Sequence, residues 1–339
     1  IFIGNSATTG GGGGMYNYGS SPTLNTCVFT SNNAAGNGAG MYNNASISAL
    51  TDCTFTDNAT ATGNGGGMYN NDGSDVTLNT CTFTGNSADS GGGMYNDTNS
   101  SPMLTDCEFI DNDAIRSGGG ICNKLMSNPT LDGCTFTSNS AGVGGGMWNG
   151  LISESTLENC TFEDNTSTWG AGGMCNEYTT ILLENCKFTS NTGGAIENTY
   201  TNSTLINCEF ENNTSNGQGG AILNEGFNHT LTGCTFKGNT VGNDLGEGGA
   251  IYNAVSSVMI LSESTICENT LPQIVGPWLD AGENCIYATC TDTDNDNIDD
   301  CFDPCISDPD NDIDGDGICG DVDPCPDWPE DCVYVDSVP

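Results

Sequence analysis

The chain of 339 residues has very few basic side chains: lysine and arginine together number 4, against 44 aspartates and glutamates, and there is 1 histidine. The formal net charge is −40. Nucleic acids and anionic membranes attract proteins chiefly through lysine and arginine, so this composition excludes both classes of partner. The sequence also lacks any apolar run of about 18 residues, so we expect no membrane insertion.

A signal peptide and an initiating methionine are also missing before Ile1, so we expect a processed or truncated product. The cysteine content, in contrast, is high at 19 residues, and 8 of these lie from Cys267 onward. Cysteines that dense in one segment indicate disulfides and an oxidising compartment. We therefore predict an extracellular protein, either secreted or held at the cell surface.

One sequence unit recurs from residue 1 to about 270. Its fullest form is Leu-Asn-Thr-Cys-Thr-Phe-Thr-Gly-Asn at 78–86, followed by Gly-Gly-Gly-Met-Tyr-Asn at 91–96. In each unit an asparagine follows the phenylalanine by three residues, and a second asparagine follows the methionine or isoleucine by two. The spacing within each block is constant while the joining loops vary, which is typical of a solenoid.

The residue pattern predicts short strands, because Cys-x-Phe and Met-x-Asn pairs have a period of two. Glycine triplets exclude helical repeats and are suited to sharp corners. Parallel, in-register coils turn each column into a ladder with a rise of roughly 4.8 Å, so Leu, Cys, Phe and Met fill the axis while asparagines bond along the turns. We therefore predict an all-β parallel solenoid of about ten coils, roughly 50 Å long.

The Gly-Gly-Ala-Ile segments at 219–222 and 248–251, combined with Phe-x-x-Asn, resemble the repeat of the polymorphic outer-membrane protein family. The resemblance implies a right-handed parallel β-helix over 1–270 and a surface-exposed setting. It implies no catalytic residues, because the motif residues of that family are structural. A connecting segment with cysteines is expected at 271–290, followed by a small irregular segment at 291–339.

Nine cysteines of the coils share one inward-facing column. These are Cys27, Cys53, Cys81, Cys107, Cys134, Cys160, Cys186, Cys208 and Cys234. We predict buried, reduced thiols that act as small hydrophobes rather than stacked disulfides or metal ligands. Cys122 and Cys175 replace an outward tyrosine two coils apart, which is too far for a direct bridge. The eight later cysteines predict a local disulfide framework of unknown connectivity.

Two aspartate-rich segments near the C-terminus each have Asp at positions 1, 3, 5 and 12, a spacing that is typical of calcium loops. An unstructured acidic linker is the alternative, but it does not account for two such loops among interleaved cysteines. The segments resemble thrombospondin type 3 repeats, although Asn297 and Ile306 depart from the pattern. The resemblance implies calcium held by Asp292, Asp294, Asp296, Asp303 and the Ile298 carbonyl, and by Asp312, Asp314, Asp316, Asp323 and the Ile318 carbonyl, with Asp299, Asp300, Asp308, Asp310 and Asp321 available to a neighbouring ion.

Catalytic residues are scarce. Lyases of β-helix shape need an arginine or lysine, but the four basic residues lie in different coils or turns, with Arg116 expected to pair with Asp113. Hydrolases need paired carboxylates, and none stands out in the coils. We expect His229 to lie in a solvated turn. These observations predict a protein that is not an enzyme.

An outward column of Tyr16, Tyr42, Tyr69, Tyr95, Trp148 and Tyr252 has two interpretations. It is either a stripe that binds surface glycans, or ordinary aromatic stacking on a sheet face. The segment from Ile1 to Asn5 is the second half of a strand block and leaves a parallel edge unpaired. We therefore expect head-to-tail association of copies into a filament or sheath. A rigid structural rod is the preferred function, with a carbohydrate-binding adhesin or a polysaccharide-degrading enzyme as alternatives.

Overall fold

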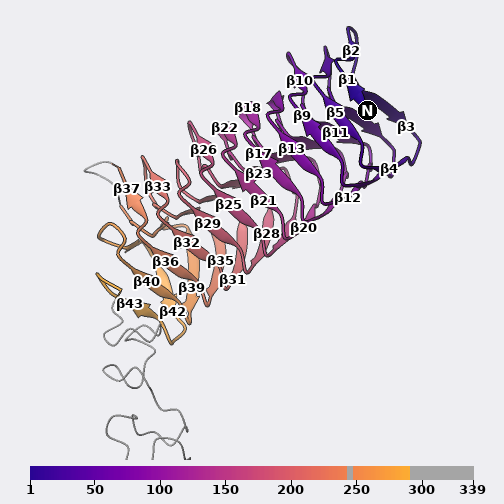
Figure 1. The fold of residues 1–339 in the computed structure, drawn as a ribbon. Coiled ribbons are helices and arrows are strands. Elements are labelled where there is room, and N and C mark those ends of the chain that lie inside the picture. The colour runs from indigo at the N-terminus through magenta and orange to yellow at the C-terminus, as the bar shows by residue number, and fades with distance from the viewer. Residues whose placement is uncertain (243–246, 291–339) are drawn as a thin grey trace, which may run out of the picture. The chain divides into compact units, whose positions relative to one another are not determined.

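The computed structural model describes residues 1–242 and 247–290, and every regular element within these ranges is a β-strand. The strands wind into stacked coils that follow one another along a single axis (Figure 1). Within the described ranges no helix is long and apolar enough to cross a membrane. The predicted all-β parallel solenoid of about ten coils is confirmed.

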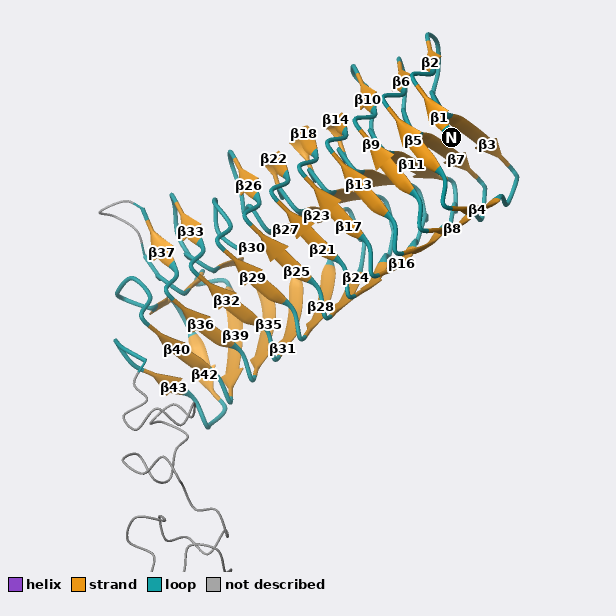
Figure 2. Ribbon diagram, in the orientation of Figure 1, coloured by secondary structure: helices purple, strands orange, loops and turns teal. Residues whose placement is uncertain are grey.

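Each coil contributes one strand to each of three long parallel sheets (Figure 2). Most coils also have a projecting loop with one short strand between the first and second of these sheets; we call this loop the hairpin, although its strand pairs only with the same loop of neighbouring coils. We name the sheets after their most regular inward column: the phenylalanine, methionine and leucine sheets. We call the sheet on the hairpins the hairpin sheet. A coil visits the phenylalanine, hairpin, methionine and leucine sheets in that order.

The phenylalanine sheet places its aromatic column in exact register, with Phe83 paired to Phe55 and Phe109. Its strands are β1 (Phe2–Ile3), β5 (Val28–Thr30), β9 (Thr54–Thr56), β13 (Thr82–Thr84), β17 (Glu108–Ile110), β21 (Thr135–Thr137), β25 (Thr161–Glu163), β29 (Lys187–Thr189), β32 (Glu209–Glu211), β36 (Thr235–Lys237), β40 (Thr265–Cys267) and β43 (Cys285–Ile286).

The methionine sheet alternates a buried Met or Ile, an outward residue and a buried Asn. Its strands are β3 (Met15–Tyr18), β7 (Met41–Asn44), β11 (Met68–Asn71), β15 (Met94–Asn96), β19 (Ile121–Asn123), β23 (Met147–Gly150), β27 (Met174–Glu177), β30 (Ile196–Thr199), β34 (Ile222–Glu225), β38 (Ile251–Asn253) and β41 (Ile274–Val275).

The leucine sheet has the simplest pattern, an inward leucine between outward polar residues, and its later strands are longer. Its strands are β4 (Thr23–Asn25), β8 (Ala49–Thr51), β12 (Thr77–Asn79), β16 (Met103–Thr105), β20 (Thr130–Asp132), β24 (Ser155–Glu158), β28 (Thr180–Glu184), β31 (Asn202–Ile206), β35 (Phe227–Thr232), β39 (Ser257–Ser262) and β42 (Trp278–Asp280).

The hairpin sheet is interrupted. Seven strands form its first part, namely β2 (Ser6–Ala7), β6 (Asn33–Ala34), β10 (Ala59–Thr60), β14 (Ser87–Ser90), β18 (Asp113–Ser117), β22 (Ser140–Val143) and β26 (Thr166–Ser167). After one coil without a strand, β33 (Thr214–Ser215) and β37 (Thr240–Val241) form a second part. Only isolated bridges through Thr192 join Thr166 to Thr214.

The core is a column of stacked phenylalanines. Successive rings from Phe2 to Phe236 lie nearly parallel, with centroids 4.5 to 5.1 Å apart. Glycine in the Gly-Gly pair before each methionine leaves room for this column. A Cβ on Gly93, for example, would lie 2.8 Å from Phe109 Cδ1 and 2.7 Å from the Gly120 carbonyl oxygen. The glycines therefore permit close approach of neighbouring coils as well as turning the chain.

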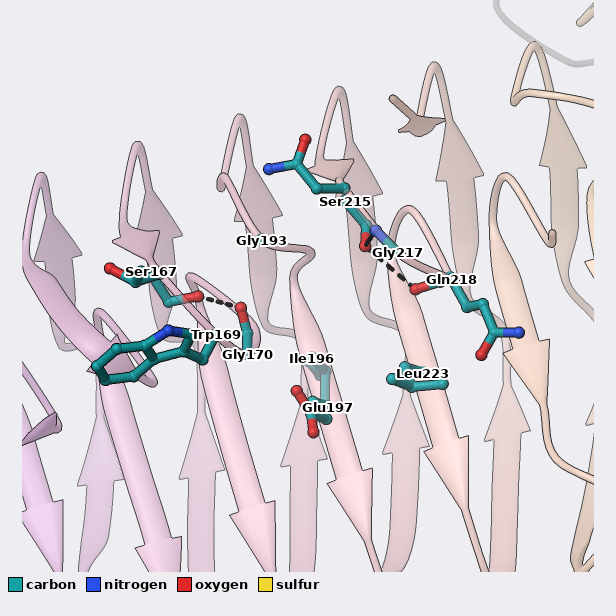
Figure 3. Close-up of a pocket in the computed structure, with 13 residues that line it drawn as sticks. Ser167, Trp169, Gly170, Gly193, Ile196, Glu197, Ser215, Gly217, Gln218 and Leu223 are labelled. Atoms are coloured by element: carbon teal, nitrogen blue, oxygen red, sulfur yellow. Dashed lines mark hydrogen bonds between the residues drawn. The ribbon is translucent and has the colours of Figure 1, made fainter. Parts of the chain in front are cut away.

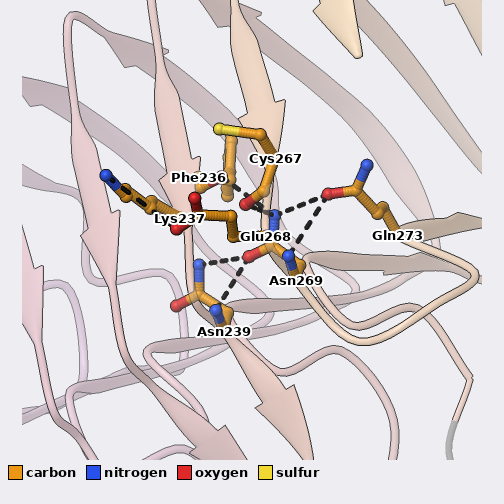
Figure 4. A network of polar contacts seen from close by, with 7 residues as sticks. All are labelled: Phe236, Lys237, Asn239, Cys267, Glu268, Asn269 and Gln273. Atoms are coloured by element: carbon orange, nitrogen blue, oxygen red, sulfur yellow. Dashed lines mark hydrogen bonds and ion pairs between the residues drawn. The ribbon is translucent and has the colours of Figure 1, made fainter. Parts of the chain in front are cut away.

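A buried asparagine ladder runs beside the phenylalanines. In each coil the asparagine Nδ2 donates to the Oδ1 of the next asparagine and to a phenylalanine carbonyl of the preceding coil, as for Asn58 with Asn86 (2.9 Å) and Phe29 (2.9 Å). The ladder extends from Asn5 to Asn269. At its end Asn269 donates to Gln273 Oε1 at 2.9 Å (Figure 4). The predicted asparagine ladders are confirmed, and a glutamine side chain terminates this one.

The second asparagine ladder lies inside the methionine sheet and is less complete. It is continuous from Asn17 to Asn224. Within the described residues Asn224 Nδ2 and Asn253 Oδ1 have no hydrogen-bond partner, so the ladder is broken between these two coils. Asn253 Nδ2 instead donates to the Pro277 carbonyl.

Most corners on either side of the phenylalanine strands use polar residues rather than the predicted glycines. Asp52, Asp57, Asp106 and Asp111, for example, have φ between 50° and 53°. Short polar side chains tolerate this left-handed conformation better than branched ones do.

The coils extend beyond the predicted boundary at residue 270. β41 and β42 add strands to the methionine and leucine sheets, and the compact coil unit spans Ile1–Asn284. Ile274 continues the Met/Ile column, which explains why the coil pattern persists there. The nine column cysteines are free thiols, as are Cys122 and Cys175, whereas Cys267, Cys285 and Cys290 are disulfide-bonded.

Candidate functional site

The predicted calcium ligands, from Asp292 to Asp323, lie outside the described residues. Within 1–242 and 247–290, no group of three or more His, Cys, Asp or Glu side chains is arranged to hold a metal ion. The calcium site therefore stays a prediction.

The prediction of an exposed tyrosine column is wrong for its central part. Tyr16 is 54% exposed, but Tyr69, Tyr95 and Trp148 are buried. With Cys122 and Cys175 they form an apolar cluster on the outer face of the methionine sheet, against which Val143 of a hairpin packs. The hairpins thus cover the central part of the column, from Tyr69 to Trp148, and this part offers no exposed aromatic surface to a sugar. Burial also raises the pKa of the Cys122 and Cys175 thiols.

The prediction for His229 is also wrong. His229 lies in β35, is 1% exposed and occupies an inward column between Ser203 and Met259. Its Nδ1 is 2.8 Å from Ser203 Oγ and its Nε2 is 3.1 Å from the Gly226 carbonyl oxygen. Since a carbonyl only accepts, Nε2 carries the proton and Ser203 donates to Nδ1. Burial lowers the pKa of His229 to about 4, so the ring is neutral near pH 7.

Three of the four basic residues pair with surface carboxylates. Arg116 contacts Asp89 of the preceding hairpin at 3.1 Å rather than the expected Asp113. Lys187 contacts Glu209 at 3.2 Å and Lys237 contacts Glu268 at 3.9 Å. Exposed pairs of this kind contribute little to stability.

The most irregular place in the solenoid is a shortened coil. Asn176 and Asn198 are separated by 22 residues, whereas equivalent asparagines elsewhere are mostly 26 to 28 apart. The missing residues are those of a hairpin, because Gly193 and Gly194 join the phenylalanine and methionine strands directly. The space that this hairpin would occupy is open, and we call it the notch (Figure 3).

The notch lies between the neighbouring hairpins at Ser167–Gly170 and Ser215–Gly219 and encloses about 140 Å³. Each hairpin is braced internally: Ser167 Oγ donates to the Gly170 carbonyl, and Ser215 Oγ donates to the Gln218 carbonyl at 3.2 Å. Leu223 and Ile196 also line it (Figure 3). Trp169 lies at the rim and is 76% exposed. Its ring rests against Gly142, since a Cβ there would lie 2.7 Å from Trp169 Cζ3.

Among the described residues that line the notch, Glu197 is the only one with an ionisable side chain. It pairs with Cys175 in the strand register and therefore occupies the next position of the same outward column. Burial, followed by the charges of Glu225 and Glu177, raises the pKa of Glu197 to about 6; the Ala171 backbone N–H and the Thr199 hydroxyl oppose this shift. Its Oε2 lies against Gly170, where a Cβ would be 2.9 Å away.

Glu177, Glu197 and Glu225 together form an acidic group. Among the described residues, no basic side chain forms an ion pair with any of them. Glu177 and Glu225 flank Thr199 on the two neighbouring strands, on the same outer face as Glu197. Within the part of the chain that the structure describes, no histidine or basic side chain lines the notch to complete an acid–base pair. Its carboxylate is suited to holding a cationic group or accepting hydrogen bonds.

A second surface feature runs along the turns that join the methionine and leucine sheets. We call it the turn stripe, and it consists of Leu125, Leu151, Ile152, Tyr178, Tyr200 and Phe227. These side chains are between 40% and 64% exposed, and all have positive φ. Backbone bonds tie the turns together, as from Ile152 N to the Tyr178 carbonyl (3.0 Å). Tyr178 and Tyr200 stack at 5.0 Å, and Phe227 meets Tyr200 edge-on at 6.2 Å.

Sequence reasoning missed both features, although each has a signal in the sequence. The shorter spacing before Asn198 marks the notch, and Glu197 in the tyrosine column marks its floor. The turn stripe shows as apolar residues where earlier coils have Asp72, Thr98 and Asn99.

Comparison with known proteins identifies the architecture. The chain matches a family model described as a right handed beta helix region over residues 1–150, 95–271 and 153–306. No curated protein and no solved structure gives a significant match. The handedness expected from the sequence is thus supported, while the finer resemblances to polymorphic outer-membrane and thrombospondin type 3 repeats stay predictions.

Proposed function

Because this chain belongs to the right-handed β-helix family, we propose that it is a non-enzymatic extracellular structural protein whose coils act as a rigid rod. One observation carries the proposal: the phenylalanine stack and the first asparagine ladder continue from coil to coil without a gap. Each coil is tied to the next by the sheets and by a buried side-chain ladder. Bending would stretch these contacts on one side, so the coil unit resists it.

The acidic C-terminal segment serves this role as a calcium-stabilised element. Its support is the spacing of aspartates from Asp292 to Asp323, which matches a loop for a hard cation. The disulfide bonds at Cys267, Cys285 and Cys290 favour an oxidising, extracellular compartment. The resemblance to thrombospondin type 3 repeats points the same way.

Head-to-tail association into a filament or sheath belongs to the same proposal and rests on sequence reasoning. Sedimentation of the natural, full-length mature protein with calcium tests it. A filament gives mass that grows with concentration, whereas a monomer over a wide concentration range contradicts self-assembly and leaves the rod itself untouched.

The rod is tested by scattering and imaging of the whole protein. We expect an elongated particle whose stiff section accounts for roughly 50 Å, and whose length is unchanged by moderate salt. A coil unit that bends freely or collapses in solution contradicts the proposal.

The two alternatives have separate tests. Incubation with acidic and neutral polysaccharides should give no cleavage products, and turnover would establish an enzyme. A glycan array should give no signal, and selective binding would favour the adhesin. The burial of Tyr69, Tyr95 and Trp148 removes the central part of the aromatic surface on which the adhesin hypothesis depended.

A further inference from the structure

The strand pairing of the coils does not require the apolar character of the turn stripe. The same turn in earlier coils carries Asp72, Thr98 and Asn99, and the coils are built in the same way there. A polar residue with a short side chain also tolerates positive φ better than a branched one does, and Ile152 has φ of 67°. Exposed apolar side chains in a strained backbone therefore cost stability at this edge, and such features concentrate at interaction sites.

Glutamate side chains lie along one side of the turn stripe. Glu177 immediately precedes Tyr178, and Glu225 lies two residues before Phe227. Both belong with Glu197 to the acidic group beside the notch. A surface that combines an apolar row with neighbouring carboxylates is complementary to a partner that combines apolar and basic side chains.

We propose that the turn stripe and the acidic group of Glu177, Glu197 and Glu225 together dock a basic amphipathic helix of another protein. The apolar face of the helix would lie along the stripe, and its lysine or arginine side chains would contact the glutamates, with one of them entering the notch. The notch volume of about 140 Å³ accommodates the end of one side chain rather than a larger ligand.

Spacing favours a helix over an extended strand. Successive rungs of the stripe are separated by the coil rise of roughly 4.8 Å. Side chains on one face of a helix recur every turn, about 5.4 Å, whereas those on one face of a strand recur at about 6.7 Å. The side-chain spacing of a helix that runs along the solenoid axis therefore matches the spacing of the stripe more closely than that of a strand does.

Other occupants fit less well. A second copy of this chain brings its own net charge of −40, and an anionic lipid surface is repelled in the same way. A sugar ring needs an open aromatic face, but Tyr178 and Tyr200 stack on each other and Phe227 packs against Tyr200.

The test uses the full-length protein and a labelled synthetic helix of about 16 residues with leucines on one face and lysines beside them. A scrambled peptide of the same composition, and a version with glutamate in place of lysine, are the matched probes. Binding is measured by fluorescence anisotropy at pH 7.5 and at pH 5, and at about 20 and 300 mM salt.

We expect binding of the basic helix alone, weakened at high salt. The double variant Tyr178→Thr/Tyr200→Thr should lower affinity about tenfold or more, because aromatic side chains at the centre of an interface carry much of its binding energy. Glu197→Gln should lower affinity at pH 7.5 and reduce its loss at pH 5. Ile47→Thr is the matched control, since Ile47 is an exposed apolar residue outside the stripe, and it should leave affinity unchanged.

Equal binding of the basic helix by the wild type, the double variant and the Ile47 variant would overturn the proposal, as would equal binding of the scrambled peptide. Absence of binding by any basic helix would also overturn it. Circular dichroism and urea denaturation of each variant show that the coils remain folded. Loss of binding to neutral lipid vesicles, or to a glycan, in the double variant would assign the stripe to that other partner and refute a helical one.

Discussion

Asn139 provides a direct test of whether the asparagine ladder holds the coils together. It lies in the middle of the solenoid and is fully buried. Its Nδ2 donates to the Phe109 carbonyl at 2.8 Å and to Asn165 Oδ1 at 3.0 Å. Its Oδ1 accepts from the Asn112 backbone N–H at 3.0 Å and from Asn112 Nδ2 at 2.9 Å. The substitution Asn139→Ala removes these four hydrogen bonds from one site.

The loss of stability depends on which hydrogen bonds the former partners of Asn139 still make after the substitution. Asn165 Oδ1 still accepts from the Asn139 backbone N–H, and Asn112 Nδ2 still donates to the Phe83 carbonyl. The Asn112 backbone N–H, however, loses the acceptor that the ladder supplies. One orphaned buried donor costs about 1–3 kcal/mol, and each hydrogen bond lost from a partly satisfied group costs about 1 kcal/mol. We therefore expect Asn139→Ala to lower the free energy of unfolding by about 4–6 kcal/mol.

The assay is equilibrium urea denaturation at fixed calcium concentration, combined with native-state hydrogen exchange. Coils of a solenoid contact mainly their neighbours, so the faster exchange should appear first in the strands beside Asn139. Asn79→Ala is the matched control, because Asn79 lies on the exposed face of β12, and it should change stability by no more than about 0.5 kcal/mol. If Asn139→Ala and Asn79→Ala have equal effects, the ladder does not stabilise the coils as we argue.

Three further predictions address ionisation, thiols and calcium. Burial lowers the pKa of His229 to about 4 in the folded protein, below its usual value of about 6.5. Between these two pH values the folded state binds fewer protons than the unfolded state does. The free energy of unfolding should therefore fall as pH decreases from about 6.5 toward 4, by up to about 3 kcal/mol. The variant His229→Met, which copies Met259 of the next coil, should abolish this part of the pH dependence in denaturation measured from pH 4 to 8, and an unchanged profile would contradict the assignment. The prediction of a buried thiol is wrong for Cys27, which is half-buried in the first full coil, but the eight buried column cysteines from Cys53 to Cys234 should resist thiol reagents until the coils are unfolded. Mass spectrometry that finds bridges between adjacent coils would contradict their free state. A chelator should release calcium and loosen the segment 291–339 while the far-ultraviolet circular dichroism of the coils persists, and calorimetry without calcium binding at millimolar concentration would refute the site.

The inward columns could be predicted from sequence because they are under one repeated constraint. A residue such as Phe109 contacts its equivalents Phe83 and Phe136 on either side, so the same side chain must recur at a fixed spacing. Asn112 likewise bonds to Asn86 and Asn139. Periodicity therefore shows which residues face the axis and how the strands pair.

Residues outside these columns were harder to place. Tyr69 points away from the axis, as period-two alternation predicts, yet the projecting hairpins bury it. Alternation within one strand contains no information about a hairpin that folds over its outer face. His229 was misplaced for a related reason: the later strands of the leucine sheet are longer, so β35 begins at Phe227 and includes a residue that the shorter early strands would leave in a turn.

The notch illustrates what a change in spacing can and cannot reveal. The short interval before Asn198 indicates that residues are missing from one coil, but sequence alone does not show whether the phenylalanine strand, a corner or the hairpin has been shortened. The structure shows that β29 and β30 keep their full register with their neighbours. The deletion therefore falls on the hairpin, which lies outside the phenylalanine, methionine and leucine columns.

Function in such a solenoid must use positions that the axial ladders leave free. Replacing Phe109 or Asn112 to make a binding site would disturb the coils on both sides, since each residue is bonded to or stacked on two equivalents. The hairpins and the turns between the methionine and leucine sheets have exposed positions that these columns leave free, although a buried serine ladder that includes Ser74 and Ser100 also runs along the turns. Variation at these two places is consequently informative: a hairpin is absent at Gly193, and the turn changes from Asp72 to Leu151 and Tyr178 without any change in strand register. Folding does not require either change. Glu197 lines the notch, and Glu177 and Glu225 lie beside the turn stripe on the same outer face, so these two places are where we expect a partner to bind.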